Sequence, residues 1–189
     1  MDKKVKVLAK ETKWAGKFLN FHHYHLSDGR VYEVCSRKLS PDPKKCDAVD
    51  IIAFNKSHKS VCIIQEYRPA VEGFVFAFPA GLREQGEDVV ETARRELWEE
   101  CGLKIATIDK ILPPSFQSPG MTDESCATVI CTVENETELT AANASDNEMI
   151  HPYWYTKERV REMLNSPYQI PMSVRCQIFL AAWSGHIVL

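Results

Sequence analysis

Glu96, Glu99 and Glu100 are the residues of this sequence whose spacing carries the clearest chemistry. They stand at positions i, i+3 and i+4, so on an α-helix all three project from one face. Like charges at this spacing repel one another, so we expect cations beside them. Arg95 can pair with Glu99, and a hard divalent cation such as magnesium, which prefers carboxylate, water and phosphate oxygens, can take the rest. The alternative is an acidic helix face that is simply solvated.

The surrounding residues predict the helix that positions these glutamates. An apolar stripe at helical spacing favours a helix over residues 88–101. The stripe consists of Val90, Ala93, Leu97 and Cys101. With about 100° of rotation per residue, the carboxylate face lies at the edge of this stripe rather than opposite to it. We therefore expect the carboxylates to be held close to the body of the protein.

The wider segment from Gly81 to Leu103 resembles the Nudix box at every defined position. The matching residues are Gly81, Glu87, Arg95, Glu96, Leu97, Glu99, Glu100, Gly102 and Leu103. The resemblance implies a loop–helix–loop that binds magnesium, for which manganese can substitute, in an enzyme that hydrolyses a diphosphate bond. It implies Glu96 and Glu100 as the principal metal ligands. Glu99 would lie beside them, and the main-chain carbonyl of Ala80 would be a further ligand.

The catalytic residues that the resemblance implies are Arg95, Glu99 and Glu148. A base must activate the attacking water, and in the matching branch of the family this base is proposed to be a glutamate on a loop after the box. Glu148 ends the polar loop 141–148 and stands at the matching position. Glu99 is the rival base.

Three flanking segments resemble the ADP-ribose pyrophosphatase branch of the family, namely residues 65–70 (QEYRPA), 78–81 (FPAG) and 118–124 (SPGMTDE). The resemblance runs over nearly the whole chain, from about Trp14 to the last predicted helix. It implies hydrolysis of ADP-ribose or a related ADP-sugar to AMP and a sugar phosphate, by a homodimer. UDP-glucose and GDP-mannose pyrophosphatases share much of the pattern and stay open as alternatives, as does a Nudix domain that only senses a nucleotide.

Substrate-binding residues follow from the same resemblance, and they are Trp14, Tyr32, Glu33, Arg37, Arg68, Gly120 and Glu124. Trp14 and Tyr32 stand where the adenine-stacking aromatic residues of the family stand, although the second position is often tryptophan. Glu33 could accept a hydrogen bond from the adenine amino group, and Arg37 and Arg68 could pair with phosphate oxygens. Glu124 could touch substrate or metal. Packing within a sheet is the alternative role for the two aromatic residues.

The remaining pattern predicts a mixed β-sheet flanked by helices, an α/β/α sandwich of the α+β class. Strands are expected in a hairpin over 14–39, in a second hairpin over 48–54 and 61–67, in the segment 74–81 with its end at Pro79, and over 106–112, 127–133 and 150–155. Further helices are expected over 156–165 and 174–184. The polar stretch 40–45 is the predicted boundary between an N-terminal β-arm (1–45), for dimerisation and base recognition, and a Nudix hydrolase domain (46–189).

The composition of this 189-residue chain limits its expected partners and its expected location in the cell. A net charge of −3 argues against a nucleic-acid partner, because such proteins usually carry a basic excess. The seven cysteines show no zinc-binding spacing. The first residues contain no signal-peptide pattern, and no apolar run is long enough to span a membrane. We therefore expect a cytoplasmic protein without a membrane partner.

Overall fold

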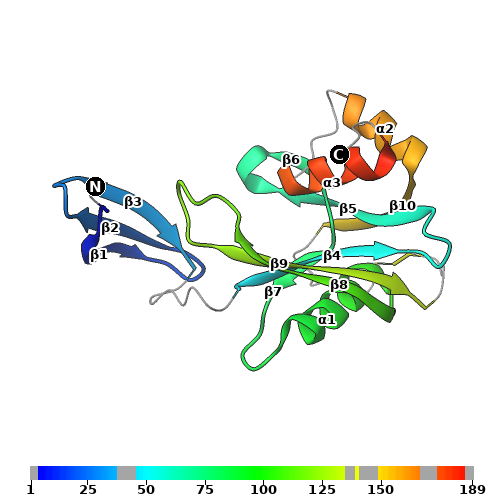
Figure 1. Cartoon of the computed structure of the whole chain (residues 1–189), viewed down its shortest axis with the longest axis horizontal. Coiled ribbons are helices and arrows are strands. Elements are labelled where there is room, and N and C mark those ends of the chain that lie inside the picture. The colour runs from blue at the N-terminus through cyan, green and yellow to red at the C-terminus, as the bar shows by residue number, and fades with distance from the viewer. Residues whose placement is uncertain (1–3, 38–45, 135–138, 141–148, 167–173, 186–189) are drawn as a thin grey trace. The chain divides into compact units, whose positions relative to one another are not determined.

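The computed structural model describes residues 4–37, 46–134, 139–140, 149–166 and 174–185. It divides into two compact units (Figure 1). The first, called here the arm unit, contains Met1–Asp47 and Pro114–Cys126. The second, called the sheet unit, contains Ala48–Pro113 and Ala127–Leu189. Each unit has its own strand arrangement.

The arm unit contains a three-stranded antiparallel sheet in the order β1-β2-β3. Its strands are β1 (Val7–Ala15), β2 (Asn20–Leu26) and β3 (Val31–Ser36). The predicted hairpin is β2 and β3, and its turn contains Gly29 at a φ of +85°, a conformation that glycine adopts without steric cost. Strand β1 was not predicted. All nine of its residues are exposed, so it lacks the apolar alternation that marks a strand in sequence.

The inner face of this sheet is defined by the pairing of β2 with β3. Asn20, His22, Val34 and Ser36 are buried on it, and the cross-strand pairs are Asn20 with Ser36 and His22 with Val34. Residues 114–126 contact β3 through the main chain, where the Cys35 N–H donates to the carbonyl of Met121 at 2.8 Å. The arm unit therefore joins segments that lie far apart in the sequence.

The sheet unit is built on a sheet in the order β10-β5-β4-β9-β8, with β6 paired to β5 and β7 paired to β4. The strands are β4 (Ala48–Phe54), β5 (Ser60–Arg68), β6 (Gly73–Ala77), β7 (Ala80–Leu82), β8 (Ile105–Phe116), β9 (Ser125–Val133) and β10 (Ile150–Thr156), and a 3₁₀ turn, η1 (Pro69–Val71), follows β5. The last three residues of β8 and the first two of β9 belong to the arm unit.

Helices cover both faces of this sheet, and they are α1 (Val89–Cys101), α2 (Lys157–Asn165) and α3 (Val174–Ser184) (Figure 1). Alternate residues of β4 point to opposite faces. Ile51 packs in the cluster that contains Leu97 of α1, and Ile52 packs in the cluster that contains Val160 of α2 and Leu180 of α3. The predicted α/β/α sandwich is therefore confirmed.

The strand predicted to end at Pro79 is confirmed as β6, which ends two residues earlier at Ala77, and the separate strand β7 after Pro79 was not predicted. Pro79 lies between them and has no N–H to donate to a sheet. Its carbonyl instead accepts a hydrogen bond from the Ile51 N–H at 2.8 Å. Among the described residues, no helix is both long and apolar enough to cross a membrane.

Candidate active site

Helix α1 is fixed at both ends by its own sequence. The Asp88 carboxylate accepts hydrogen bonds from the N–H groups of Val90 and Glu91, and the Glu91 side chain accepts one from the Asp88 N–H, which forms a capping box. Gly102 ends the helix at a φ of +68°, and its N–H donates to the Trp98 carbonyl at 2.9 Å. The predicted helix over 88–101 is confirmed, with Asp88 as its N-cap.

Glu96, Glu99 and Glu100 of α1 differ in their exposure, as their place beside the apolar stripe predicts. Leu97 is fully buried. Glu100 is only 6% exposed, whereas the side chain of Glu99 is 39% exposed. The side chain of Glu96, at 12%, lies between these values. The carboxylates therefore run from the interior to the surface along one edge of the helix.

The segment before the helix contacts two of these carboxylates. The Ala80 N–H, at the start of β7, donates to Oε2 of Glu100 at 2.9 Å. Gly81 lies directly beneath Glu96, because a Cβ built on Gly81 would be 1.8 Å from Oε1 of Glu96. Glycine is thus required there for a close approach, and a larger residue would fill the space that the carboxylate occupies.

Arg95 holds the acidic groups together with four hydrogen bonds to carboxylates and donates a fifth to a main-chain carbonyl, so all five of its N–H donors are used. It binds Glu87 through Nε at 2.8 Å and Nη2 at 3.0 Å. Its Nη1 donates to Glu96 at 2.7 Å and to Glu99 at 3.2 Å. Its Nη2 also donates to the carbonyl of Leu82 at 2.9 Å. Since its donors are engaged, Arg95 positions carboxylates in this structure.

These contacts shift the pKa values of both partners. The hydrogen bonds from Arg95 lower the pKa of Glu87 to about 2. The hydrogen bonds to Glu87, followed by those to Glu96, raise the pKa of Arg95 above its usual value. Both groups are therefore charged at neutral pH, and the bidentate pair ties the loop before α1 to the helix.

The predicted ligand set fits a hard divalent cation in its chemistry. Carboxylate and carbonyl oxygens are the donors that such cations prefer, and they come here from Glu96, Glu99, Glu100 and Ala80. Because Gly81 has no side chain, the Glu96 carboxylate can occupy the space beside its Cα. Within the described parts of the chain, however, no three acidic, histidine or cysteine side chains already surround a common point. The carboxylates are directed instead to Arg95 and to the Ala80 N–H.

Several predicted substrate-binding residues meet in the arm unit. The Tyr32 hydroxyl donates to the Gly120 carbonyl at 2.9 Å, and both residues line an open cavity of about 670 Å³ together with Glu33. Arg37 does not stand ready for a phosphate, since its Nε donates to the Glu124 carboxylate. The structure thus brings together Tyr32, Glu33 and Gly120, and it pairs Arg37 with Glu124.

Trp14 and Arg68 have other surroundings. Trp14 is 61% exposed on β1, and its ring packs over Gly16, where an added Cβ would be 2.1 Å from the ring. It does not line the cavity of Tyr32, although its cross-strand neighbour Phe21 does. In the sheet unit, Arg68 binds the buried Glu66 at 2.8 Å. Glu148 lies outside the described residues.

Sequence reasoning did not assign a role to Glu87 or Asp123. Glu87 is the main partner of Arg95, but it precedes the helix, so helical spacing does not reveal the contact. The one sequence feature that marked Glu87 was its defined position in the Nudix box. Asp123 has both carboxylate oxygens buried without a hydrogen-bond partner among the described residues. Nothing in the sequence distinguished it from its neighbour Glu124.

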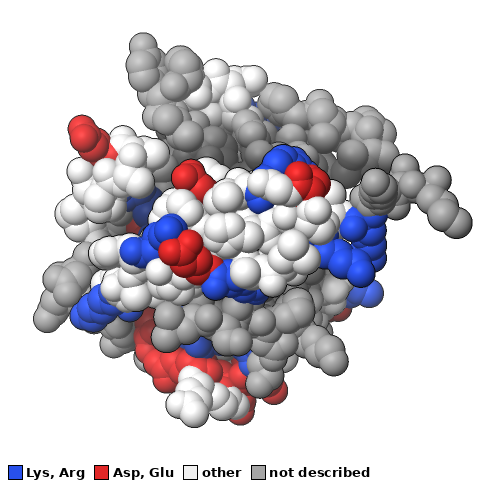
Figure 2. All heavy atoms as spheres, turned by 90° about the vertical axis from the view of Figure 1, so that its left-hand side faces the viewer, with Lys and Arg blue, Asp and Glu red and all other residues white. Residues whose placement is uncertain are grey.

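Charges on the molecular surface are mixed. Figure 2 shows basic and acidic side chains interspersed over the middle of the face in view and acidic side chains gathered at its lower edge. In the arm unit, Lys13 pairs with Glu11 and Arg30 pairs with Asp28. The described residues of that face thus do not form the continuous basic surface that nucleic-acid binding favours.

Comparison with known proteins agrees with the geometry of α1 and the segment before it. The model of the NUDIX domain matches residues 44–173, and the chain therefore belongs to the Nudix hydrolase family. Hydrolases of this family generally use a divalent metal.

Among curated relatives, an ADP-ribose pyrophosphatase of Saccharomyces cerevisiae is 36% identical over 93 residues, which is 48% of this chain and 40% of the relative. An ADP-ribose pyrophosphatase of Bacillus subtilis is 31% identical over 121 residues, or 63% of this chain and 61% of the relative. The matches thus span about two fifths to three fifths of these relatives. The crystal structure of an ADP compounds hydrolase has the same fold, with a TM-score of 0.70, 20% identity and coverage of 97% of this chain and 96% of the other.

Proposed function

We propose that this protein hydrolyses the diphosphate bond of ADP-ribose or a related ADP-sugar in a magnesium-dependent reaction. Water adds to one phosphorus, the bridging P–O bond breaks, and the products are AMP and a sugar phosphate. The observation that carries the proposal is the arrangement around Arg95, which holds Glu96 and Glu99 on one edge of α1. The names of the curated relatives support the choice of an ADP-sugar.

In this proposal Glu96 and Glu100 hold magnesium, with Glu99 and the Ala80 carbonyl as further ligands. When bound, the metal would neutralise diphosphate charge and favour deprotonation of a water. The contact between the Ala80 N–H and Glu100 supports this assignment, since it keeps the loop against the carboxylate. Arg95 acts as a positioning residue, because its guanidinium contacts Glu96 and Glu99.

The base that takes the proton from water is Glu148 or Glu99. Glu99 is the most exposed of Glu96, Glu99 and Glu100 and can reach solvent, which suits a proton acceptor. Adenine would stack on Tyr32, with Glu33 accepting a hydrogen bond from its amino group. Trp14 would need to contact the same base from another copy of the arm, so a homodimer is part of the proposal.

The test is a panel of ADP-ribose, UDP-glucose and GDP-mannose, assayed with magnesium, with manganese and with a chelator. We expect AMP release from ADP-ribose only when a divalent cation is present. Glu100→Gln should lower turnover by about 10²-fold or more, the scale of losing one major electrostatic contributor. The matched control is Glu162→Gln, which changes an exposed glutamate of α2 in the same way.

Each outcome decides a different part of the proposal. Near-normal turnover in Glu100→Gln would remove Glu100 from the metal site. Hydrolysis of UDP-glucose or GDP-mannose at ten times the rate of ADP-ribose would overturn the substrate and keep the reaction class. If none of the three compounds were cleaved, the reaction class itself would be wrong.

A further inference from the structure

The open cavity of about 670 Å³ in the arm unit holds a donor and an acceptor side by side. His23 lines it beside Glu33, and Nε2 of His23 lies 3.7 Å from Oε1 of Glu33. The two residues are cross-strand partners on β2 and β3, so their side chains share one face of the sheet. These side chains are 26% and 69% exposed, so a molecule in the cavity can contact both of them.

His23 has neighbours on both sides of this face. The ring of Phe21, which also lines the cavity, packs against the imidazole at 5.6 Å between ring centres and 75° between ring planes. Glu11 of β1 is also a cross-strand partner of His23, but its Oε2 lies 3.4 Å from Nε2 of His25. Each histidine of this face is therefore paired with a different glutamate, His25 with Glu11 and His23 with Glu33.

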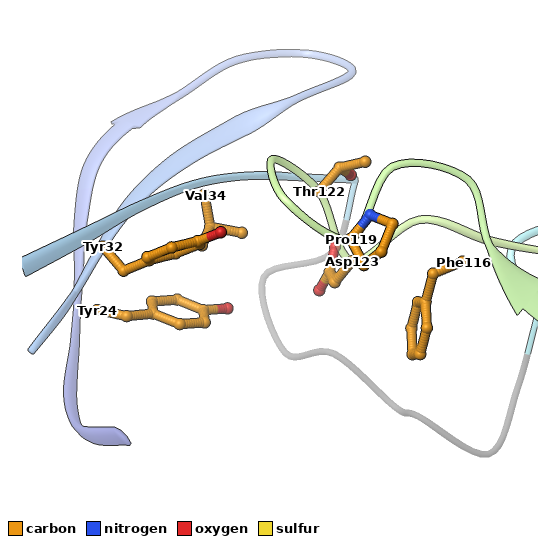
Figure 3. A pocket seen from close by; sticks show the side chains of 7 residues that line it. All are labelled: Tyr24, Tyr32, Val34, Phe116, Pro119, Thr122 and Asp123. Carbon is orange, nitrogen blue, oxygen red and sulfur yellow. The ribbon is translucent and has the colours of Figure 1, made fainter. Parts of the chain in front are cut away.

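Tyr32, on which the adenine of the proposed substrate would stack, lines the same cavity and is held in place by its neighbours. Its hydroxyl is fixed by the hydrogen bond to the Gly120 carbonyl. Figure 3 shows the ring of its cross-strand partner Tyr24 beside it. A base in this cavity would therefore meet a fixed aromatic ring together with the acceptor of Glu33 and the donor of His23.

Adenine carries a donor beside an acceptor on two of its edges. A carboxylate oxygen accepts and an imidazole N–H donates, so the pair of Glu33 and His23 complements either edge. The 6-amino nitrogen lies about 3 Å from N7 but only about 2.3 Å from N1, and the 3.7 Å between Nε2 and Oε1 fits the wider edge. Building on the proposed function, we propose that His23 determines base specificity. Its Nε2–H donates to N7 of adenine, while Glu33 accepts from the 6-amino group.

Other bases lack part of this match. Guanine carries the carbonyl oxygen O6 in place of the amino group, and this acceptor would face the Glu33 carboxylate. 7-Deazaadenine keeps the amino group but has a C–H in place of N7, so it loses only the contact with His23. 1-Deazaadenine lacks N1 and keeps both contacts. The two deaza compounds therefore report on the two edges of adenine separately.

Calorimetry of nucleotide binding to the full chain in EDTA tests this assignment. We expect AMP to bind about three- to tenfold more tightly than 7-deaza-AMP, the scale of one hydrogen bond, and 1-deaza-AMP to bind like AMP. GMP should bind at least about tenfold more weakly than AMP. AMP should also slow the modification of Cys35 by a disulfide reagent, because the exposed thiol of Cys35 lines the same cavity.

The decisive variant is His23→Ala, which should lower the affinity for AMP by about three- to tenfold and leave the affinity for 7-deaza-AMP unchanged. His23→Gln keeps an N–H donor and should retain the preference for AMP over 7-deaza-AMP. The matched control is His25→Ala, which removes an imidazole of the same face from its pair with Glu11 and should change neither affinity.

Three results would overturn the assignment. Equal binding of AMP and 7-deaza-AMP would remove the contact with N7, and an equal fall of both in His23→Ala would make the role of His23 structural. Unchanged modification of Cys35 in saturating AMP would place the base outside this cavity. The assay contains no metal and follows no hydrolysis, so its outcome is separable from that of the proposed reaction. ADP-ribose can be cleaved without a contact to N7, and AMP can bind even where ADP-ribose is not cleaved.

Discussion

Replacing Gly81 by alanine should damage the reaction far more than the fold. The added Cβ would lie 1.8 Å from Oε1 of Glu96 and 1.9 Å from its Cδ. Ordinary contact begins near 3.4 Å, so the carboxylate must retreat by about 1.5 Å or more. The nearest atoms all belong to the end of a flexible side chain, which can move without the main chain. The cost to stability is therefore expected to stay below about 1 kcal/mol.

The effect on turnover follows from the size of this displacement. A misplacement of about 1 Å in a catalytic arrangement can cost about 10²-fold in rate. Glu96 is a proposed metal ligand and is also bound to Arg95, so its retreat alters both contacts. We expect Gly81→Ala to lower turnover of ADP-ribose by about 10²-fold and to raise the magnesium concentration needed for half-maximal rate.

The assay is AMP release at saturating ADP-ribose over a range of magnesium concentrations, with the melting temperature measured on the same samples. Gly73→Ala is the matched control, because a Cβ on Gly73 would meet only the carbonyl of Val71, at an ordinary 3.6 Å. It should behave as the unaltered protein in both measurements. Unchanged turnover and magnesium dependence in Gly81→Ala would refute the role given to Glu96. A large loss of stability would show instead that Gly81 serves the fold.

Three further predictions concern Arg95, Glu87 and the cysteines. Lysine at position 95 can supply three of the five donors, so Arg95→Lys should lose about 2 kcal/mol after allowance for partial exposure, and the melting temperature should fall by about 4–8 °C. The pKa of Glu87 is lowered to about 2 from an ordinary 4.5, so its ion pair stabilises the fold fully above about pH 5 and loses that effect as the pH falls towards 2. The difference in urea midpoint between the unaltered protein and Glu87→Gln should therefore be larger at neutral pH than at pH of about 3, and a constant difference would contradict the pairing. Of the seven thiols, only that of Cys35 is exposed, and burial raises the pKa of Cys131 and Cys176 to about 12. A disulfide reagent at mildly alkaline pH should modify one thiol rapidly in the native protein and seven in denaturant; several fast thiols would contradict this burial.

The parts of the fold that were predicted are those whose signals are local. The apolar stripe of α1 and its capping residues are all contained in fifteen consecutive positions, Asp88–Gly102, and the helix was predicted within one residue of its observed start. The β2–β3 hairpin has its turn signal in the sequence. Strand β1 has no such pattern, because neither of its faces is buried in the arm unit.

In the candidate site, too, the features set by local spacing could be predicted and those set by tertiary contacts could not. The side chains of Glu96, Glu99 and Glu100 could be assigned to one edge of α1 because helical geometry relates them directly. The approach of Gly81 to Glu96 and the bond from the Ala80 N–H to Glu100 depend on how β7 meets the helix, and spacing along the chain does not determine that. The unpaired state of Asp123 could not be predicted either, since it depends on burial and on the absence of donors among the described residues.

The pairing of the arginines bears on how an acidic chain can hold an anionic substrate. Arg37 is bound to Glu124, Arg68 to Glu66, and Arg95 to three glutamates. A phosphate would therefore share or compete with a glutamate for each of these guanidinium groups. Such exchange costs little at the surface, where ion pairs contribute about 0–1 kcal/mol, and Arg68 is 47% exposed.

Exchange is far more costly at Arg95, because five hydrogen bonds would have to be replaced. The arginine at the centre of the box is thus the least available to substrate, and its charge is already balanced by Glu87, Glu96 and Glu99. In the proposed reaction, a divalent cation held by the α1 carboxylates would supply the positive charge that a diphosphate needs there. Such a cation would let a chain of net charge −3 bind an anionic diphosphate although Arg95 is already paired with carboxylates.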